Sequence, residues 1–158
     1  MAAVQIKKIL VALDLSTQAS NVTERVAEYA ICLAKALEAE ILAIHITPAL
    51  LPHYGRFRVP ASVMENFKDE VIGEAEKNMT ELVKTKFQGL KAQGRVVNGQ
   101  PADEILNQAK ESNADLIVMG THNQAGLGRF FFGSVAEKVV KNAGIPVMSI
   151  RPDITTAK

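Results

Sequence analysis

Short apolar runs and longer amphipathic stretches alternate along this chain. Apolar runs of strand length occur at 9–13, 41–46, 115–120 and 145–150, each bounded by polar or turn-forming residues. Such runs are typical of strands that a parallel sheet buries on both faces. A shorter run at 95–97 is flanked by polar residues and predicts a strand at the edge of the sheet.

Between these runs, apolar residues recur at steps of three and four, which predicts helices that bury one face. Asn21 and Glu24 resemble a capping box at the start of the first helix. Cys32 is expected to lie partly buried beside its apolar stripe. That stripe consists of Val22, Val26, Tyr29, Ala30, Leu33 and Leu37. The stripe of a second, longer helix consists of Val63, Phe67, Val71, Ala75, Met79, Leu82, Val83 and Phe87.

Two further helices complete the pattern. Pro101 suits the first turn of a third helix, and Asp103 and Glu104 suit its positive end. A fourth helix is expected to start near 133–134 and to bury Val135, Val139 and Val140. The resulting order, βαβαβαβαβ, predicts an α/β fold in which one parallel sheet carries helices on both faces.

The strand ends indicate where a ligand would bind. In open α/β sheets, ligands bind beyond the carboxyl ends of strands, where the winding direction reverses. If the runs at 9–13 and 115–120 are neighbours at the centre, the strand order is 3-2-1-4-5. Asp14 and Gly120 would then face the same crevice.

The segment 120–134 is a glycine-rich loop that leads into the fourth helix. A helix start presents unpaired N–H groups, which favour a phosphate. Gly133 would let an anion approach the backbone, and the Ser134 hydroxyl could add a hydrogen bond. The loop contains only incomplete versions of the Rossmann and Walker A spacings. Turn geometry with one helix cap explains the glycines equally well, so the spacing alone leaves both interpretations open.

Composition narrows the class of protein. The 158 residues fit one domain, 1–158, with a polar tail at 151–158. The net charge is +1, with 18 basic and 17 acidic residues, so no basic excess suggests a nucleic-acid partner. A single cysteine favours a reducing compartment. Because neither a signal peptide nor an apolar run of membrane length is evident, we expect a cytoplasmic protein with no membrane partner.

Several segments of the chain resemble one known family. The most specific are Ala-Asp-Leu-Ile-Val-Met-Gly-Thr-His at 114–122, Gly-Ser-Val-Ala-Glu-Lys-Val at 133–139 and Ile-Pro-Val at 145–147. With the strand and helix patterns before them, they resemble the universal stress protein family over almost the whole chain. The resemblance implies a five-stranded parallel sheet in the order 3-2-1-4-5 and a homodimer formed through strand 145–150.

The ATP-binding branch of this family carries the motif Gly, two residues, Gly, nine residues, Gly-Ser/Thr. The chain has Gly120, then Asn123 in place of the second glycine, then Gly133-Ser134. The resemblance therefore implies an ATP site, with Mg²⁺ as an associated ion. The nucleotide-binding residues that we expect on this basis are Ala12, Leu13, Asp14, Ile46, Met119, Gly120, Asn123, Arg129, Gly133, Ser134 and Val135.

The resemblance also implies roles for these residues. Asp14 would lie near the ribose or a bound metal, Ile46 and Met119 would lie against the adenine, and the residues from 133 to 135 would contact the phosphates. Arg129 either reaches the phosphates or is solvated. His45, in an apolar strand, is expected to be a packed core residue.

The hypothesis that follows is a regulatory stress-response protein that binds ATP or a related adenine nucleotide. No Ser-His-Asp or Cys-His set can be assembled from the sequence, so no catalytic residues are assigned and any hydrolysis would be slow. Asn123 leaves open a dimeric interaction module of the same fold that has lost the nucleotide. A third reading, an ATP-hydrolysing enzyme, predicts that Asp14→Ala abolishes phosphate release.

Overall fold

Strands and helices alternate along the chain in this computed structural model, which describes residues 3–16, 20–49, 60–121 and 133–152. The strands are β1 (Lys8–Ala12), β2 (Glu40–Pro48), β3 (Ala92–Gly99), β4 (Leu116–Gly120) and β5 (Val147–Ile150). The helices are α1 (Ser20–Leu37), α2 (Ala61–Lys86), α3 (Pro101–Glu111) and α4 (Ser134–Asn142). The predicted βαβαβαβαβ order is confirmed.

The five strands form one parallel sheet in the order β3-β2-β1-β4-β5, as predicted. At the centre, Ala12 of β1 pairs with Ile44 of β2 on one side and Met119 of β4 on the other. The chain winds from β1 toward β2 and β3, then crosses back to β4. The winding direction therefore reverses between β1 and β4, and their carboxyl ends flank the switch point.

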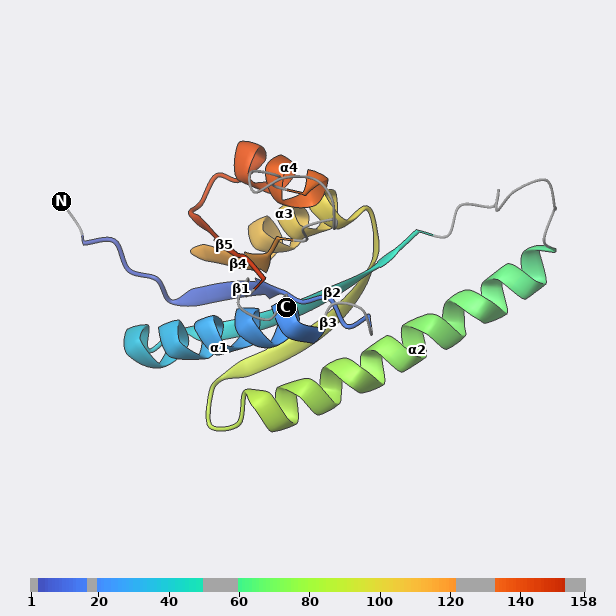
Figure 1. The fold of residues 1–158 in the computed structure, drawn as a ribbon, viewed down its shortest axis with the longest axis horizontal. Helices are drawn as coiled ribbons and strands as arrows, with labels where there is room; N and C mark the ends of the chain where they lie inside the picture. Colours follow the sequence, from blue (N-terminus) through green and yellow to red (C-terminus); the bar gives the residue numbers. More distant parts are fainter. Residues whose placement is uncertain (1–2, 17–19, 50–59, 122–132, 153–158) are drawn as a thin grey trace, which may run out of the picture.

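Helices cover both faces of the sheet (Figure 1), with α1 and α2 on one face and α3 and α4 on the other. Ile9 and Val11 of β1 pack under α1, whereas Leu10 lies in the core that α3 and α4 cover. All three side chains are fully buried. Burial of alternate residues on opposite faces explains why the central strands are apolar without interruption.

The edge strands differ in length from their prediction. β3 spans eight residues rather than the three at 95–97. Its first half carries Gly94, where a Cβ atom would lie 2.6 Å from Met79 Cγ of α2. The helix packs directly on this backbone, so the strand needs no apolar run and gave no apolar signal. β5 begins after Pro146, two residues later than predicted.

In α1 and α4, four side chains expected to be at least partly buried are exposed instead. Tyr29 and Cys32 are two of them. At 3.6 residues per turn they lie about 100° and 200° around α1 from the fully buried Ala30, so Cys32 is on the far face. Leu37 is the last residue of α1, and Val140 lies on the outer side of α4.

The helix α2 is longer than the sheet surface that it covers. With 26 residues it spans about 39 Å. Ala75, Met79 and Phe87 are buried against the sheet, whereas Val63 and Phe67 are each 53% exposed. Figure 1 shows the first half of α2 extending past the sheet edge. The predicted apolar stripe is therefore one helix, but only its second half lies in the core.

Candidate functional site

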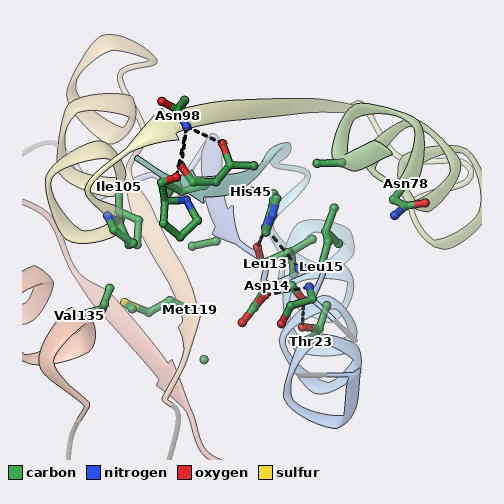
Figure 2. A pocket seen from close by; sticks show the side chains of 18 of the residues that line it. Leu13, Asp14, Leu15, Thr23, His45, Asn78, Asn98, Ile105, Met119 and Val135 are labelled. Atoms are coloured by element: carbon green, nitrogen blue, oxygen red, sulfur yellow. Dashed lines mark hydrogen bonds between the residues drawn. The ribbon is translucent and has the colours of Figure 1, made fainter. Parts of the chain in front are cut away.

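A cavity of about 1020 Å³ lies at the carboxyl edge of the sheet, over the switch point between β1 and β4. It extends across the strand ends, so elements from both faces line it. In Figure 2, Ile105, Met119 and Val135 lie on one side of the cavity and Asn78 of α2 on the other, with Asp14 and His45 between them. The volume is at the upper end for a site that encloses a small organic ligand.

The structure brings the predicted site residues together. All those within the described residues line this one cavity: Ala12, Leu13, Asp14, Ile46, Met119, Gly120, Gly133, Ser134 and Val135. Asn123 and Arg129 lie outside the described residues. The resemblance predicted that these residues lie close together. They stand at the ends of β1, β2 and β4 or at the start of α4, and these ends meet at the switch point.

The start of α4 forms the anion-attracting part of the cavity. Gly133 is its N-cap residue, and no side chain within the described residues caps this end. The first helical hydrogen bond runs from Glu137 N to Gly133 O, at 3.0 Å. The N–H groups of Ser134, Val135 and Ala136 consequently have no acceptor inside the helix. They provide hydrogen-bond donors and a partial positive charge next to the cavity.

Apolar side chains form the wall under the sheet end. Ile46 of β2 and Met119 of β4 belong to the core on the side of α3 and α4. Ile105 of α3 is 3% exposed and lines the cavity beside them. Ile105 was not predicted as a site residue, although its position on the inward face of a helix that follows β3 could have indicated it. The wall can hold a flat, apolar group.

Three hydrogen bonds fix the backbone around Asp14, which is half-buried. The Leu13 N–H donates to Ile44 O at 2.8 Å and extends the ladder past the end of β1. The Ser16 N–H donates to Asp14 Oδ1 at 2.9 Å. The Thr23 hydroxyl of α1 donates to the Asp14 carbonyl at 2.5 Å. Asp14 therefore has a defined position at the mouth of the cavity.

The first turn of α1 also corrects the predicted capping box. α1 begins at Ser20, so Asn21 lies inside the helix rather than at its cap. Thr23, two residues later, reaches back to the Asp14 loop instead. This contact could not be predicted from the sequence, because it depends on how α1 packs against the end of β1.

His45 is not the packed core residue that its apolar surroundings predicted. It is half-buried and lines the cavity, and its Nδ1 atom lies 3.0 Å from Leu13 O and 3.3 Å from Leu15 N. Successive side chains of a strand point to opposite faces, so His45 faces α1 and α2 while Ile44 and Ile46 face α3 and α4. A polar residue between two apolar ones was the signal that could have identified it.

The charged side chains lining the cavity, within the described residues, are Asp14, Lys68 and Glu74, besides His45. In the same part of the chain, no group of three His, Cys, Asp or Glu side chains is placed to hold a metal ion. Outside the cavity, the hydrogen bond from Lys141 lowers the pKa of the Glu137 carboxyl, an interaction that holds two exposed side chains of α4 together.

None of the helices that the structure describes combines the length and the apolar character needed to span a membrane.

Known proteins are similar to this chain in sequence and in fold. Residues 5–151 match the universal stress protein family. Universal stress protein MJ0531 of Methanocaldococcus jannaschii is 34% identical over 149 residues, covering 92% of this chain and 82% of that protein. The solved structure of protein MJ0577, from the same organism, has a TM-score of 0.73 at 27% identity and covers 94% of this chain and 97% of its own. That of the universal stress protein from Archaeoglobus fulgidus in complex with dAMP has a TM-score of 0.60 at 24% identity, covering 91% and 97%. This chain belongs to the universal stress protein family.

Proposed function

We propose that this protein binds an adenine nucleotide, ATP in particular, and acts as a regulatory stress-response protein of the ATP-binding branch. The observation that carries the proposal is the meeting, in one cavity, of an apolar wall, the Asp14 carboxyl and the start of α4, which no described side chain caps. These are the three kinds of group that a base, a ribose and a phosphate chain require. The dAMP complex of the Archaeoglobus protein supports an adenine ligand for this fold.

The base would lie against the apolar wall. Ile46 and Met119 come from the two strands that flank β1, and Ile105 adds a third apolar surface. Burial of a flat aromatic base against such side chains is favourable because it removes apolar area from water. This arrangement favours a planar ring but discriminates less between rings that carry different substituents.

The phosphates would lie at the start of α4. Free N–H groups at a helix start bind anions through directed hydrogen bonds and through the helix dipole. Gly133 and Ser134 form this corner, and Ser134 is exposed there. Asn123 and Arg129, proposed for the same corner, would supply an amide and a guanidinium to the phosphate oxygens.

Asp14 would face the ribose or a nucleotide-bound Mg²⁺. Mg²⁺ is commonly held by one or two carboxylates together with the phosphates of its nucleotide. One half-buried carboxyl beside an anion-attracting helix start fits that donor set. When bound, the ion would neutralise phosphate charge, while Asp14 fixes its location.

A proline substitution can test the phosphate contact directly. Ser134 occupies the first helical position, where proline is tolerated because the missing N–H is not used by the helix. Gly133 has ψ of 143°, which suits a residue before proline. Ser134→Pro should therefore remove one donor and keep the fold. Ser134→Ala, the matched control, removes the hydroxyl and keeps the N–H.

We expect Ser134→Pro to weaken ATP binding by about 1.5–3 kcal/mol relative to Ser134→Ala, because a hydrogen bond to a charged group is lost. That is about ten- to a hundredfold in Kd, measured by isothermal titration calorimetry. Adenosine, which has no phosphates, should bind both variants equally. Equal ATP affinity in the two variants would exclude this corner as the phosphate site. If the folded wild-type chain binds no nucleotide at millimolar concentration, the interaction module becomes the better interpretation.

A further inference from the structure

His45 contacts both peptide groups that flank Asp14. The Leu13 carbonyl belongs to the peptide before the Asp14 Cα atom, and the Leu15 N–H belongs to the peptide after it. The His45 Nδ1 atom lies 3.0 Å from the first and 3.3 Å from the second. Dashed lines in Figure 2 mark the contacts of this ring. These two peptide planes define the backbone angles of Asp14, and therefore the direction in which its carboxyl points.

One ring nitrogen cannot satisfy both partners at once. If Nδ1 carries a proton, it donates to Leu13 O, and the Leu15 N–H is left facing another donor. If Nδ1 is unprotonated, it accepts from Leu15 N, and its lone pair faces the Leu13 carbonyl. The ring therefore has two bonding states, each of which holds a different side of Asp14.

Two further hydrogen bonds restrain the loop around Asp14, so the bonding state of His45 affects the peptides that they leave free to turn. Thr23 holds the Asp14 carbonyl, and the Ser16 N–H holds its carboxyl oxygen Oδ1. The peptide between Asp14 and Leu15 is thus held at its oxygen by α1, while its N–H is directed at His45. Transfer of the His45 hydrogen bond from one peptide to the other therefore changes the restraint on both sides of the Asp14 carboxyl.

We infer that His45 is a positioning residue for Asp14: its Nδ1 atom bonds to a peptide that flanks Asp14 and so fixes the carboxyl orientation that receives the nucleotide. The inference rests on the proposed function and extends it with a residue on the opposite face of the sheet from the apolar wall. His45 need not touch the ligand, because it acts through the backbone on either side of Asp14.

A double-mutant cycle separates this role from simple packing. His45→Phe keeps a ring and removes the nitrogen, whereas His45→Asn keeps a polar group near the Nδ1 position that can donate or accept. We expect His45→Phe to weaken ATP binding by about three- to tenfold, the effect of one lost hydrogen bond, and His45→Asn to remain within about twofold of wild type. In an Asp14→Ala background, His45→Phe should change the affinity by less than about twofold.

Two results of the cycle would overturn the inference. An equal loss from His45→Phe in both backgrounds would mean that the ring acts independently of Asp14. A failure of His45→Asn to restore affinity, in a folded variant with native circular dichroism, would mean that volume or aromaticity matters rather than the hydrogen bond.

Nuclear magnetic resonance of the wild-type protein gives a second test that needs no variant and no nucleotide. If Nδ1 accepts from Leu15, a scalar coupling across the hydrogen bond should connect the Leu15 amide nitrogen with Nδ1. If Nδ1 donates to Leu13 O, the proton on Nδ1 should be observed directly. Absence of both signals would refute the contact.

The two tests distinguish failure of the inference from failure of the proposed function. Absence of ATP binding by the folded wild-type protein would remove the nucleotide, and with it the proposed function, whatever His45 does. ATP binding without coupling between His45 and Asp14 would retain the function and refute the positioning role. Binding with coupling, together with the resonance signals of the Nδ1 hydrogen bond, supports both.

Discussion

Gly120, at the end of β4, lies against α1. A Cβ atom at this position would be 2.4 Å from Val22 Cγ1, closer than two carbon atoms approach without a clash. The glycine that begins the family motif therefore has a packing role in this chain, apart from any contact with a nucleotide. Absence of a side chain lets α1 approach the sheet beside the cavity.

We predict that Gly120→Ala destabilises the protein, because Val22 or the helix that carries it must move. Overpacking of this kind costs about 1–3 kcal/mol, measured as the change in the free energy of unfolding in urea. Gly73→Ala is the matched control, since a Cβ atom at Gly73 in α2 meets no atom within 4 Å. There the change should stabilise the protein by about 0.5–1 kcal/mol, as alanine does relative to glycine in a helix. Effects of the same sign would contradict the packing argument.

Residues at strand ends were predictable, whereas residues that act through packing were not. Asp14 and Met119 end apolar runs, and the sheet order places such ends together. His45 was misassigned because its face of the strand becomes a cavity wall only where α2 leaves the sheet. The contact of Thr23 with Asp14 was not predicted, because a single hydroxyl on a helix forms no recognisable sequence pattern. The sequence indicates which face of a helix or strand is apolar, but not where that face loses contact with the neighbouring element.

At the scale of elements, α2 also shows that the sequence does not reveal where an apolar face loses its partner. Its apolar positions continue for the whole helix, yet only those near the sheet are buried. Periodicity reveals the side of a helix that is apolar. The length of the sheet, which depends on every other strand, decides how much of that side finds a partner.

Substitutions in the two halves of α2 should differ in their effect on stability. Met79 is 2% exposed, so Met79→Ala should reduce the free energy of unfolding by about 2–5 kcal/mol through a cavity and lost apolar contacts. Val63 is 53% exposed, and Val63→Gln should change it by no more than about 0.5 kcal/mol. Denaturant titration of both variants checks the difference. A large loss from Val63→Gln would show that another surface covers the first half of α2.

At the scale of the whole molecule, simple rules predicted the sheet. Right-handed crossovers and apolar central runs led to the order 3-2-1-4-5 on the condition that the runs at 9–13 and 115–120 are neighbours, and the family resemblance implied the same order. The bounds of β3 and β5 were harder to predict from the sequence, since both are edge strands. Gly94 fits under α2, and Pro146 stands before β5, so neither strand shows the uniform apolar character of β1.

The exposed edge of β5 leads to a prediction about assembly. Within the described residues, β5 pairs with β4 alone. The Pro146 carbonyl accepts a hydrogen bond from Ile117 N–H of β4, and the Ile150 carbonyl accepts one from Thr121 N–H, directly after β4. Because backbone groups alternate in direction along a strand, the N–H groups of Val147 and Ser149 point away from β4. An unpaired edge of this kind can pair with a second copy across a two-fold axis, as we propose for this protein.

Ser149→Pro should therefore convert a dimer into a monomer without disturbing the fold. Proline is accepted at an edge strand when its nitrogen faces away from the sheet, so the bonds between β4 and β5 survive. Ser149→Ala, which keeps the N–H, should remain dimeric. Light scattering at micromolar concentration should give twice the chain mass for wild type and Ser149→Ala, and the chain mass for Ser149→Pro. A monomeric wild-type protein would refute the dimer, and a dimeric, folded Ser149→Pro would move the interface to another surface.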